Sequence, residues 1–126
     1  MKKKILVVDD DLEQQDLYVD IFKGKGFAVI SAKDGLEGLD EALKEKPDLV
    51  FSGIIMPRMD GFEFIRNLRS NVATAQTPVI LFSHLGREED RERANKLSKV
   101  EFMVKGIDGP KDILNKIETL IGPAGN

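Results

Sequence analysis

Short apolar runs recur along the chain and alternate with longer segments whose apolar residues follow a helical period. Because the runs are almost continuously apolar, they are typical of strands in a parallel sheet that is buried on both faces. The predicted strands are residues 5–8, 27–30, 49–51, 79–82 and 100–104.

Between these runs, apolar residues at three- and four-residue spacings predict five helices. Gly24 suits the end of the first helix and Pro47 ends the second. The fourth, near residues 88–97, is mostly charged and offers only Ala94 and Leu97 to a core. In the other helices the predicted core contacts are Leu17, Tyr18, Ile21 and Phe22; Leu36, Leu39 and Leu43; Phe62, Ile65 and Leu68; and Ile113, Leu114, Ile117, Leu120 and Ile121.

Five strands alternating with five helices predict right-handed βαβ crossovers and a doubly wound α/β sheet. The 126 residues suffice for one domain, which we expect to cover residues 1–121, with 122–126 as a flexible tail. In such a sheet, ligands bind beyond the carboxyl ends of the strands.

Composition excludes several functions. The net charge of −3 provides no basic field for nucleic acid, and the chain lacks cysteine. Three lysines near the N-terminus precede only four apolar residues, too few for a signal peptide or a membrane helix. We therefore expect a cytoplasmic protein that binds neither membrane nor nucleic acid directly.

Acidic residues follow the first predicted strand, as Asp9, Asp10 and Asp11. Adjacent carboxylates at a strand end can hold Mg²⁺, which prefers oxygen ligands. An aspartate there can equally cap the next helix. The two interpretations coexist if one residue caps while the others face the crevice.

The other strand ends differ in what they offer. Ser83 could donate to a phosphoryl oxygen, although serine is also common in turns. Lys105 could balance the acidic residues or remain solvated. His84 is the only histidine and is expected to lie exposed in a loop, without metal partners. The third strand ends at Gly53, so no nucleophile stands there.

Together these segments resemble the receiver domain of bacterial two-component response regulators, and the resemblance covers nearly the whole chain. The segments that carry it are Ile5-Leu6-Val7-Val8-Asp9-Asp10, Pro47-Asp48-Leu49-Val50, Met56-Pro57-Arg58-Met59-Asp60-Gly61, Pro78-Val79-Ile80-Leu81-Phe82-Ser83 and Val104-Lys105. The resemblance implies a flavodoxin-like (βα)5 sandwich with strand order 2-1-3-4-5.

The resemblance also implies roles for single residues. Asp9 and Asp10 correspond to the Mg²⁺ ligands, Ser83 to the hydroxyl that senses the phosphoryl group, Lys105 to the family lysine and Phe102 to the switch aromatic, while Gly53 occupies the position of the phosphorylated aspartate. Gly106 stands where a proline, often cis, usually follows the lysine, and glycine makes a cis bond improbable.

Glycine at position 53 has no side-chain carboxylate that could be phosphorylated. Ser52 should point to the opposite face of the sheet, and Asp48 lies at the wrong end of the strand. No cofactor is then required, and only a weakened Mg²⁺ site remains at Asp9 and Asp10. Lys105 is expected to neutralise part of their charge.

The sequence therefore predicts an atypical receiver that is not an enzyme and that binds protein partners without phosphorylation. The family's usual output surface, formed by the fourth helix, fifth strand and fifth helix, is the expected contact face. The charge run at residues 87–93 is either part of it or a solvated helix surface. Alternatives are an inactive variant of a phosphoaccepting regulator, a Mg²⁺-dependent phosphotransfer enzyme using Asp9 or Asp10, and a flavodoxin-like cofactor binder.

Overall fold

Five parallel strands form one sheet in the order β2-β1-β3-β4-β5, as predicted. The structure is a computed structural model and describes residues 1–125. The strands are β1 (Lys4–Val8), β2 (Ala28–Ala32), β3 (Leu49–Ser52), β4 (Val79–Ser83) and β5 (Val100–Val104). Each predicted strand is present, with ends displaced by two residues or fewer.

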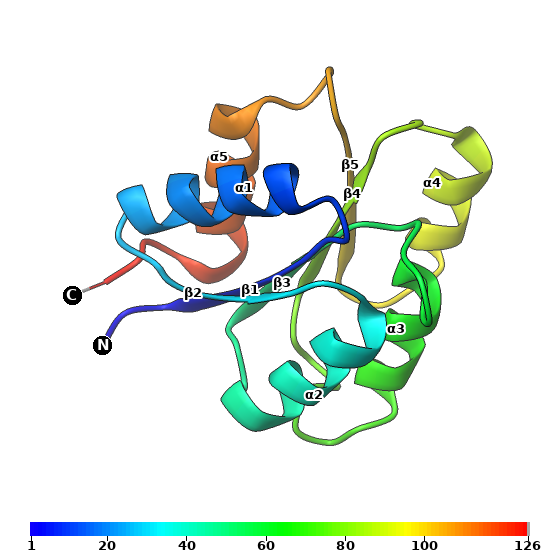
Figure 1. Cartoon of the computed structure of the whole chain (residues 1–126), viewed down its shortest axis with the longest axis horizontal. Helices are drawn as coiled ribbons and strands as arrows, with labels where there is room; N and C mark the ends of the chain where they lie inside the picture. Colours follow the sequence, from blue (N-terminus) through cyan, green and yellow to red (C-terminus); the bar gives the residue numbers. More distant parts are fainter. Residues whose placement is uncertain (126) are drawn as a thin grey trace.

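Helices cover both faces of this sheet (Figure 1). They are α1 (Leu12–Gly24), α2 (Gly35–Glu45), α3 (Gly61–Arg69), α4 (Glu88–Asn95) and α5 (Pro110–Ile121). α1 and α5 lie on one face, while α2, α3 and α4 lie on the other. None of the helices in residues 1–125 combines the length and apolarity needed to cross a membrane.

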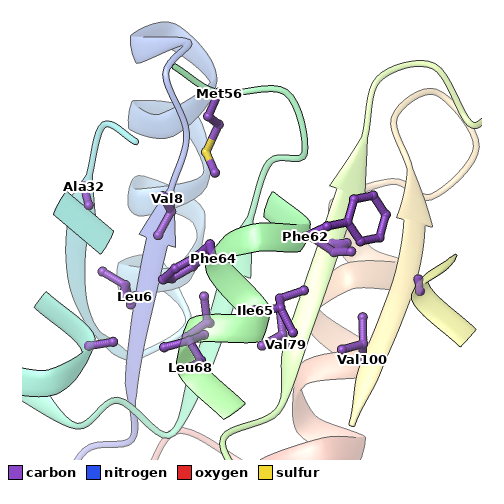
Figure 2. Packing of buried hydrophobic residues seen from close by; sticks show 14 residues of the cluster. Leu6, Val8, Ala32, Met56, Phe62, Phe64, Ile65, Leu68, Val79 and Val100 are labelled. Atoms are coloured by element: carbon purple, nitrogen blue, oxygen red, sulfur yellow. The ribbon is translucent and has the colours of Figure 1, made fainter. Parts of the chain in front are cut away.

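Two apolar clusters fill the space between the sheet and its helices. Alternate residues of β1 supply both of them, since Leu6 and Val8 face α2 and α3, while Ile5 and Val7 face α1 and α5. Figure 2 shows the first cluster, in which the side chains of α3 lie beside β1. This two-sided burial accounts for the continuous apolarity of the runs.

The helix faces differ from the prediction in α1 and α2. Leu17, Leu36 and Leu43 were expected in the core but are 52%, 39% and 37% exposed. In α2 the fully buried positions are the small residues Gly35, Gly38 and Ala42, while Leu39 packs against the first cluster as predicted. A Cβ on Gly38 would lie 3.0 Å from the Val8 side chain, so glycine allows α2 to approach the sheet closely.

The C-terminal segment also differs from the prediction. Residues 122–125 do not form a loose tail, because Ala124 is buried in the cluster beneath α1 and α5. Its carbonyl oxygen accepts a 2.7 Å hydrogen bond from the backbone N–H of Lys3. Asn126, the last residue of the predicted tail, lies outside the described residues.

Aspartates begin three helices at the carboxyl edge of the sheet. Asp11, Asp34 and Asp60 are the N-caps of α1, α2 and α3, and each side chain accepts backbone N–H groups of its helix. Arg58 also donates two hydrogen bonds to Asp34, at 2.8 and 3.1 Å. These bonds, which also lower the pKa of Asp34, fasten the β3–α3 loop to α2.

This edge is tightly packed at Gly61. A Cβ at this position would overlap the carbonyl oxygen of Gly53. We expect Gly61→Ala to lower the free energy of unfolding by about 1–3 kcal/mol in urea denaturation, because backbone must shift to admit the methyl group. Gly24→Ala is the matched control, since a Cβ there meets nothing within 4 Å. It should be neutral or stabilise by about 0.4–1 kcal/mol. An equal effect of both substitutions would contradict the close approach.

Candidate functional site

A pocket of about 210 Å³ opens at the carboxyl edge of the sheet, beside Gly53. Its lining comes from the end of β4, from the loops after β1, β3 and β4, and from the first turn of α4. Four carboxylates line it: Asp9, Asp10, Asp11 and Asp90. The sequence predicted a site at the carboxyl ends of the strands, and the structure has a pocket there.

Asp9 is the buried member of this group and is 6% exposed. One carboxylate oxygen accepts a 2.9 Å hydrogen bond from the backbone N–H of Asp11, and the other accepts from Gln14 Nε2 at 3.0 Å. Burial raises the pKa of Asp9, and the neighbouring charge of Asp10 acts in the same direction, while the two hydrogen bonds oppose them. Asp11 caps α1, so capping and pocket-lining roles do coexist in this triplet.

Gln14 joins Asp9 to His84 and was not recognised from the sequence. Its Nε2 lies 2.8 Å from His84 Nε2, in addition to its bond with Asp9. Gln15 is also buried and donates to the backbone carbonyl of Asp9 at 3.2 Å. A usable signal existed, because Gln14 is spaced four residues before Tyr18 and lies on the same buried face of α1.

Gly53 leaves open the space that a side chain would occupy. A Cβ built there would lie 3.8 Å from the Val8 carbonyl oxygen and 3.9 Å from the Asp9 carboxylate, which is ordinary contact distance. The Ser52 hydroxyl is fully buried and donates to the Gly53 carbonyl oxygen at 2.8 Å. Ser52 does not line the pocket, as the strand alternation predicted.

Ser83 lines the pocket, whereas Lys105 does not. The Ser83 hydroxyl is 3% exposed and accepts a 2.9 Å hydrogen bond from the Gly86 backbone N–H. Lys105 is exposed and forms no ion pair within residues 1–125. The expected neutralisation of Asp9 and Asp10 by Lys105 is therefore not observed.

The loop after Lys105 turns sharply at Gly106. Gly106 follows a trans peptide bond and has φ +87°, a conformation that favours glycine. The chain turns immediately, since the backbone N–H groups of Ile107 and Asp108 both bond to the Val104 carbonyl oxygen.

Phe102, the aromatic residue of β5, is partly buried beneath α4. The Arg91 guanidinium lies 4.8 Å from the centre of its ring, and Arg93 lies 3.9 Å from the ring of Phe62. Such contacts each stabilise by about 0.5–1 kcal/mol at exposed sites. Part of the charge run on α4 therefore packs on aromatic rings rather than standing free in solvent.

Asp9 and Asp10 are the residues of the pocket that could hold Mg²⁺. Within residues 1–125 there is no group of three or more His, Cys, Asp or Glu side chains arranged to hold a metal ion. Asp9 and Asp10 are the carboxylates nearest the family's metal position, and both oxygens of Asp9 already accept hydrogen bonds. With Gly53 providing no third carboxylate, these residues would leave most of the coordination to water.

Comparison with known proteins gives a consistent result. Residues 5–118 match the family described as the response regulator receiver domain. The chain is 27% identical over 124 residues to the polar-differentiation response regulator DivK of Brucella anthropi, covering 98% of this chain and all of that protein. It superposes on the Vibrio cholerae chemotaxis protein CheY4 with a TM-score of 0.87 and 26% identity, covering 95% and 99% of the two chains.

Other relatives are longer proteins. The chain is 38% identical over 104 residues to protein-glutamate methylesterase/protein-glutamine glutaminase 6 of Anaeromyxobacter dehalogenans. That match covers 81% of this chain and 29% of the methylesterase. The chain is also 31% identical to the probable transcriptional regulator ycf29 of Pyropia yezoensis, in a match that covers 96% of this chain and 54% of that protein.

The raised pKa of Asp9 predicts a pH dependence of stability. The folded protein retains a proton on Asp9 at pH values where the unfolded chain, with an ordinary pKa of 3.8, has lost it. Stability should therefore fall as the pH rises through this interval. Relative to Asp9→Asn, the wild-type protein should lose stability as the pH rises above the ordinary pKa of 3.8, measured by urea unfolding at several pH values.

Asp20→Asn is the control, because it removes one charge from the exposed surface of α1. Parallel pH profiles for the wild type and Asp9→Asn would show that burial does not perturb Asp9.

Proposed function

The chain belongs to the response regulator receiver domain family, and on that premise we propose that it acts as a pseudo-receiver. It is a receiver domain of two-component signalling whose phosphoacceptor position is Gly53. In this proposal it signals by binding protein partners and is not switched by phosphorylation at the usual site. It requires no cofactor and works in the cytoplasm, without direct contact with nucleic acid or membrane.

The absence of a side chain at Gly53 is the observation that carries this proposal. The pocket around it has space for a Cβ, so the missing aspartate is a loss of chemistry and not a consequence of crowding. Neighbouring oxygens do not replace it, because Ser52 points away and both oxygens of Asp9 are engaged. A variant that has lost the signal but kept its partners remains the alternative within the same family.

The surface formed by α4, β5 and α5 is the proposed partner face. Arg91 packs over Phe102, the residue at the family's switch position, and thereby supports one arrangement of α4 against β5. On α5, Lys116 forms a 3.2 Å ion pair with Glu101 of β5. A surface held in this way suits a module whose binding does not depend on a phosphoryl group.

An enzymatic role finds less support. Of the two aspartates, only Asp10 is exposed enough to act as a nucleophile, and a second catalytic group aligned with it is not found in residues 1–125. We therefore propose that the protein is not an enzyme, in contrast to the phosphotransferase alternative.

Incubation with acetyl phosphate and Mg²⁺, followed by intact-protein mass spectrometry, tests the loss of phosphorylation. The wild-type protein should gain no phosphoryl mass, whereas Gly53→Asp should gain one, since its carboxylate would extend towards Asp9. Gly53→Asn is the control of equal size and should gain none. A stable, acid-labile gain on the wild-type protein, for example at Asp10, would overturn the proposal.

Magnesium titration followed by NMR tests the weakened metal site separately. The wild-type protein should bind Mg²⁺ weakly, and Gly53→Asp should bind about tenfold more tightly because it supplies a third carboxylate. Gly53→Asn should resemble the wild type. Sub-micromolar affinity of the wild-type protein would show that Asp9 and Asp10 suffice for a strong site.

A further inference from the structure

Lysine residues cluster at the amino edge of the sheet, opposite the acidic pocket. The segments that lead into the five parallel strands are residues 1–3, 25–27, 46–48, 70–78 and 96–99, and they meet at this edge. They contain one acidic residue, Asp48, and six basic residues, the edge lysines Lys2, Lys3, Lys25, Lys46, Lys96 and Lys99. The net charge of −3 is therefore unevenly distributed, and one end of the molecule is cationic.

The charge of the edge lysines is not neutralised by the chain itself. None of the six forms an ion pair within residues 1–125, and all except the half-buried Lys3 are exposed. The Asp48 carboxylate accepts the backbone N–H of Lys4 at 2.7 Å, and Glu45 pairs with the Lys4 ammonium at 3.2 Å. These two acidic groups are thus engaged by Lys4, and the edge lysines remain available to a ligand.

Two edge lysines have a backbone conformation that favours glycine. Lys46 has φ +49° and Lys99 has φ +56°, in the left-handed region that a Cβ disfavours. Arg58 has φ +67°, but its side chain is held by the 2.8 Å ion pair with Asp34. Lys46 and Lys99 have no such pair within residues 1–125, so stability of the fold does not explain lysine at either position.

The edge lysines form a row across the sheet. In the strand order β2-β1-β3-β4-β5, Lys25 precedes β2, Lys2 and Lys3 precede β1, Lys46 precedes β3, and Lys99 precedes β5. The segment before β4 contains no lysine and presents Val72, which is 99% exposed. Neighbouring strands are about 4.8 Å apart, so the row spans about 19 Å, the length of an extended peptide of about six residues.

We propose that the amino edge of the sheet binds an extended, acidic segment of a partner protein. The carboxylates of that segment pair with the edge lysines, and one of its apolar side chains packs on Val72. This surface crosses all five strands at the end opposite the pocket, whereas the proposed α4, β5 and α5 face lies to one side of the sheet. It does not depend on the residue at the phosphoacceptor position and therefore goes beyond the proposed function.

A protein segment fits this surface better than a nucleic acid or a membrane does. Single-stranded nucleic acid stacks its bases on exposed aromatic rings, and all eight aromatic residues of the chain are buried or half-buried. A peripheral membrane contact inserts several apolar side chains together with the cations. In the segments that lead into the strands, Met1 and Val72 are the only large apolar residues that are exposed.

A synthetic peptide tests the inference on the full chain. The probe is a capped peptide of about eight residues, all glutamate except one central leucine, and binding is followed by NMR of the isotope-labelled protein. We expect saturable shifts at Lys25, Lys46, Val72 and Lys99 and none at Gly53. Raising the salt from about 0.05 M to about 0.5 M should weaken binding at least tenfold, because exposed charges are then screened. Failure of the peptide to shift these residues would overturn the inference.

Glycine substitutions separate a binding role from a structural one. Lys46→Gly and Lys99→Gly should each weaken the peptide about two- to fivefold, and the double variant about tenfold, because each removes one exposed ion pair with the ligand. Both substitutions should also raise the urea midpoint of unfolding, because glycine adopts a positive φ without strain. Weaker binding together with a lower midpoint would show that the lysines support the fold, and would contradict the inference.

Lys33→Gln is the matched control for Lys46→Gln. Both remove one positive charge from an exposed lysine, but Lys33 lies at the carboxyl edge of the sheet. Lys46→Gln should weaken the peptide about two- to fivefold, whereas Lys33→Gln should leave its affinity unchanged. Equal weakening by the two substitutions would mean that attraction follows net charge alone, and the amino edge would not be the site.

A double-mutant cycle tests the apolar part of the contact. Replacing the peptide leucine by glycine should weaken binding to the wild-type protein about threefold and should not change binding to Val72→Ser. An equal loss with both proteins would show that the leucine does not meet Val72, which contradicts the proposed position of the segment.

Other ligands for this edge are further outcomes of the test. Phosphatidylserine vesicles or oligothymidylate that bind as tightly as the peptide would identify a surface for phosphate groups and overturn the choice of a protein. Self-association of the wild-type protein that is lost in the double glycine variant, measured by analytical ultracentrifugation, would place a second copy there instead. A phosphoryl gain on the wild-type protein would overturn the proposed function without affecting the peptide result, so the two failures are distinguishable.

Discussion

The burial of β1 on both faces is the constraint on which the rest of the structure depends. Ile5, Leu6, Val7 and Val8 are at most 1% exposed, so helices must cover both sides of the strand. Right-handed crossovers then bring the carboxyl ends of all strands to one edge. Because the chain changes abruptly from apolar to acidic after Val8, that edge receives Asp9 and Asp10 at the point where the sheet changes winding direction.

The same constraint decides which parts of the fold could be predicted. Continuous apolar runs identified the strands because both faces of each central strand are buried. Periodicity was less reliable for α2, where the sheet is approached through Gly38 and two of the three leucines, Leu36 and Leu43, are exposed. A hydrophobic stripe gives the direction of a helix face, but it does not show that a small residue permits closer packing than a large one.

For the site, sequence position and strand alternation were informative, whereas the conformations of side chains in loops and helices were not. Gly53 was placed at the end of the third strand from the sequence, and Asp9, Asp10 and Ser83 reach one pocket because strand ends share an edge. Lys105 also follows a strand end but does not line the pocket, and the chain turns sharply at the next residue, Gly106. The bond between Gln14 and His84 joins residues seventy positions apart and depends on side-chain conformations that no local pattern encodes.

The fold offsets the negative charge of the acidic pocket only in part. The N-terminus of α1 lies beside Asp9 and Asp11, where the helix dipole and free backbone N–H groups favour anions. These interactions and the Gln14 amide stabilise the ionised form of Asp9, yet burial still raises its pKa. Burying the Asp9 carboxylate therefore carries a free-energy cost, and no ion pair within residues 1–125 offsets it. It follows from ending a strand that is buried on both faces in a run of acidic residues, because the first of them, Asp9, stays nearly buried.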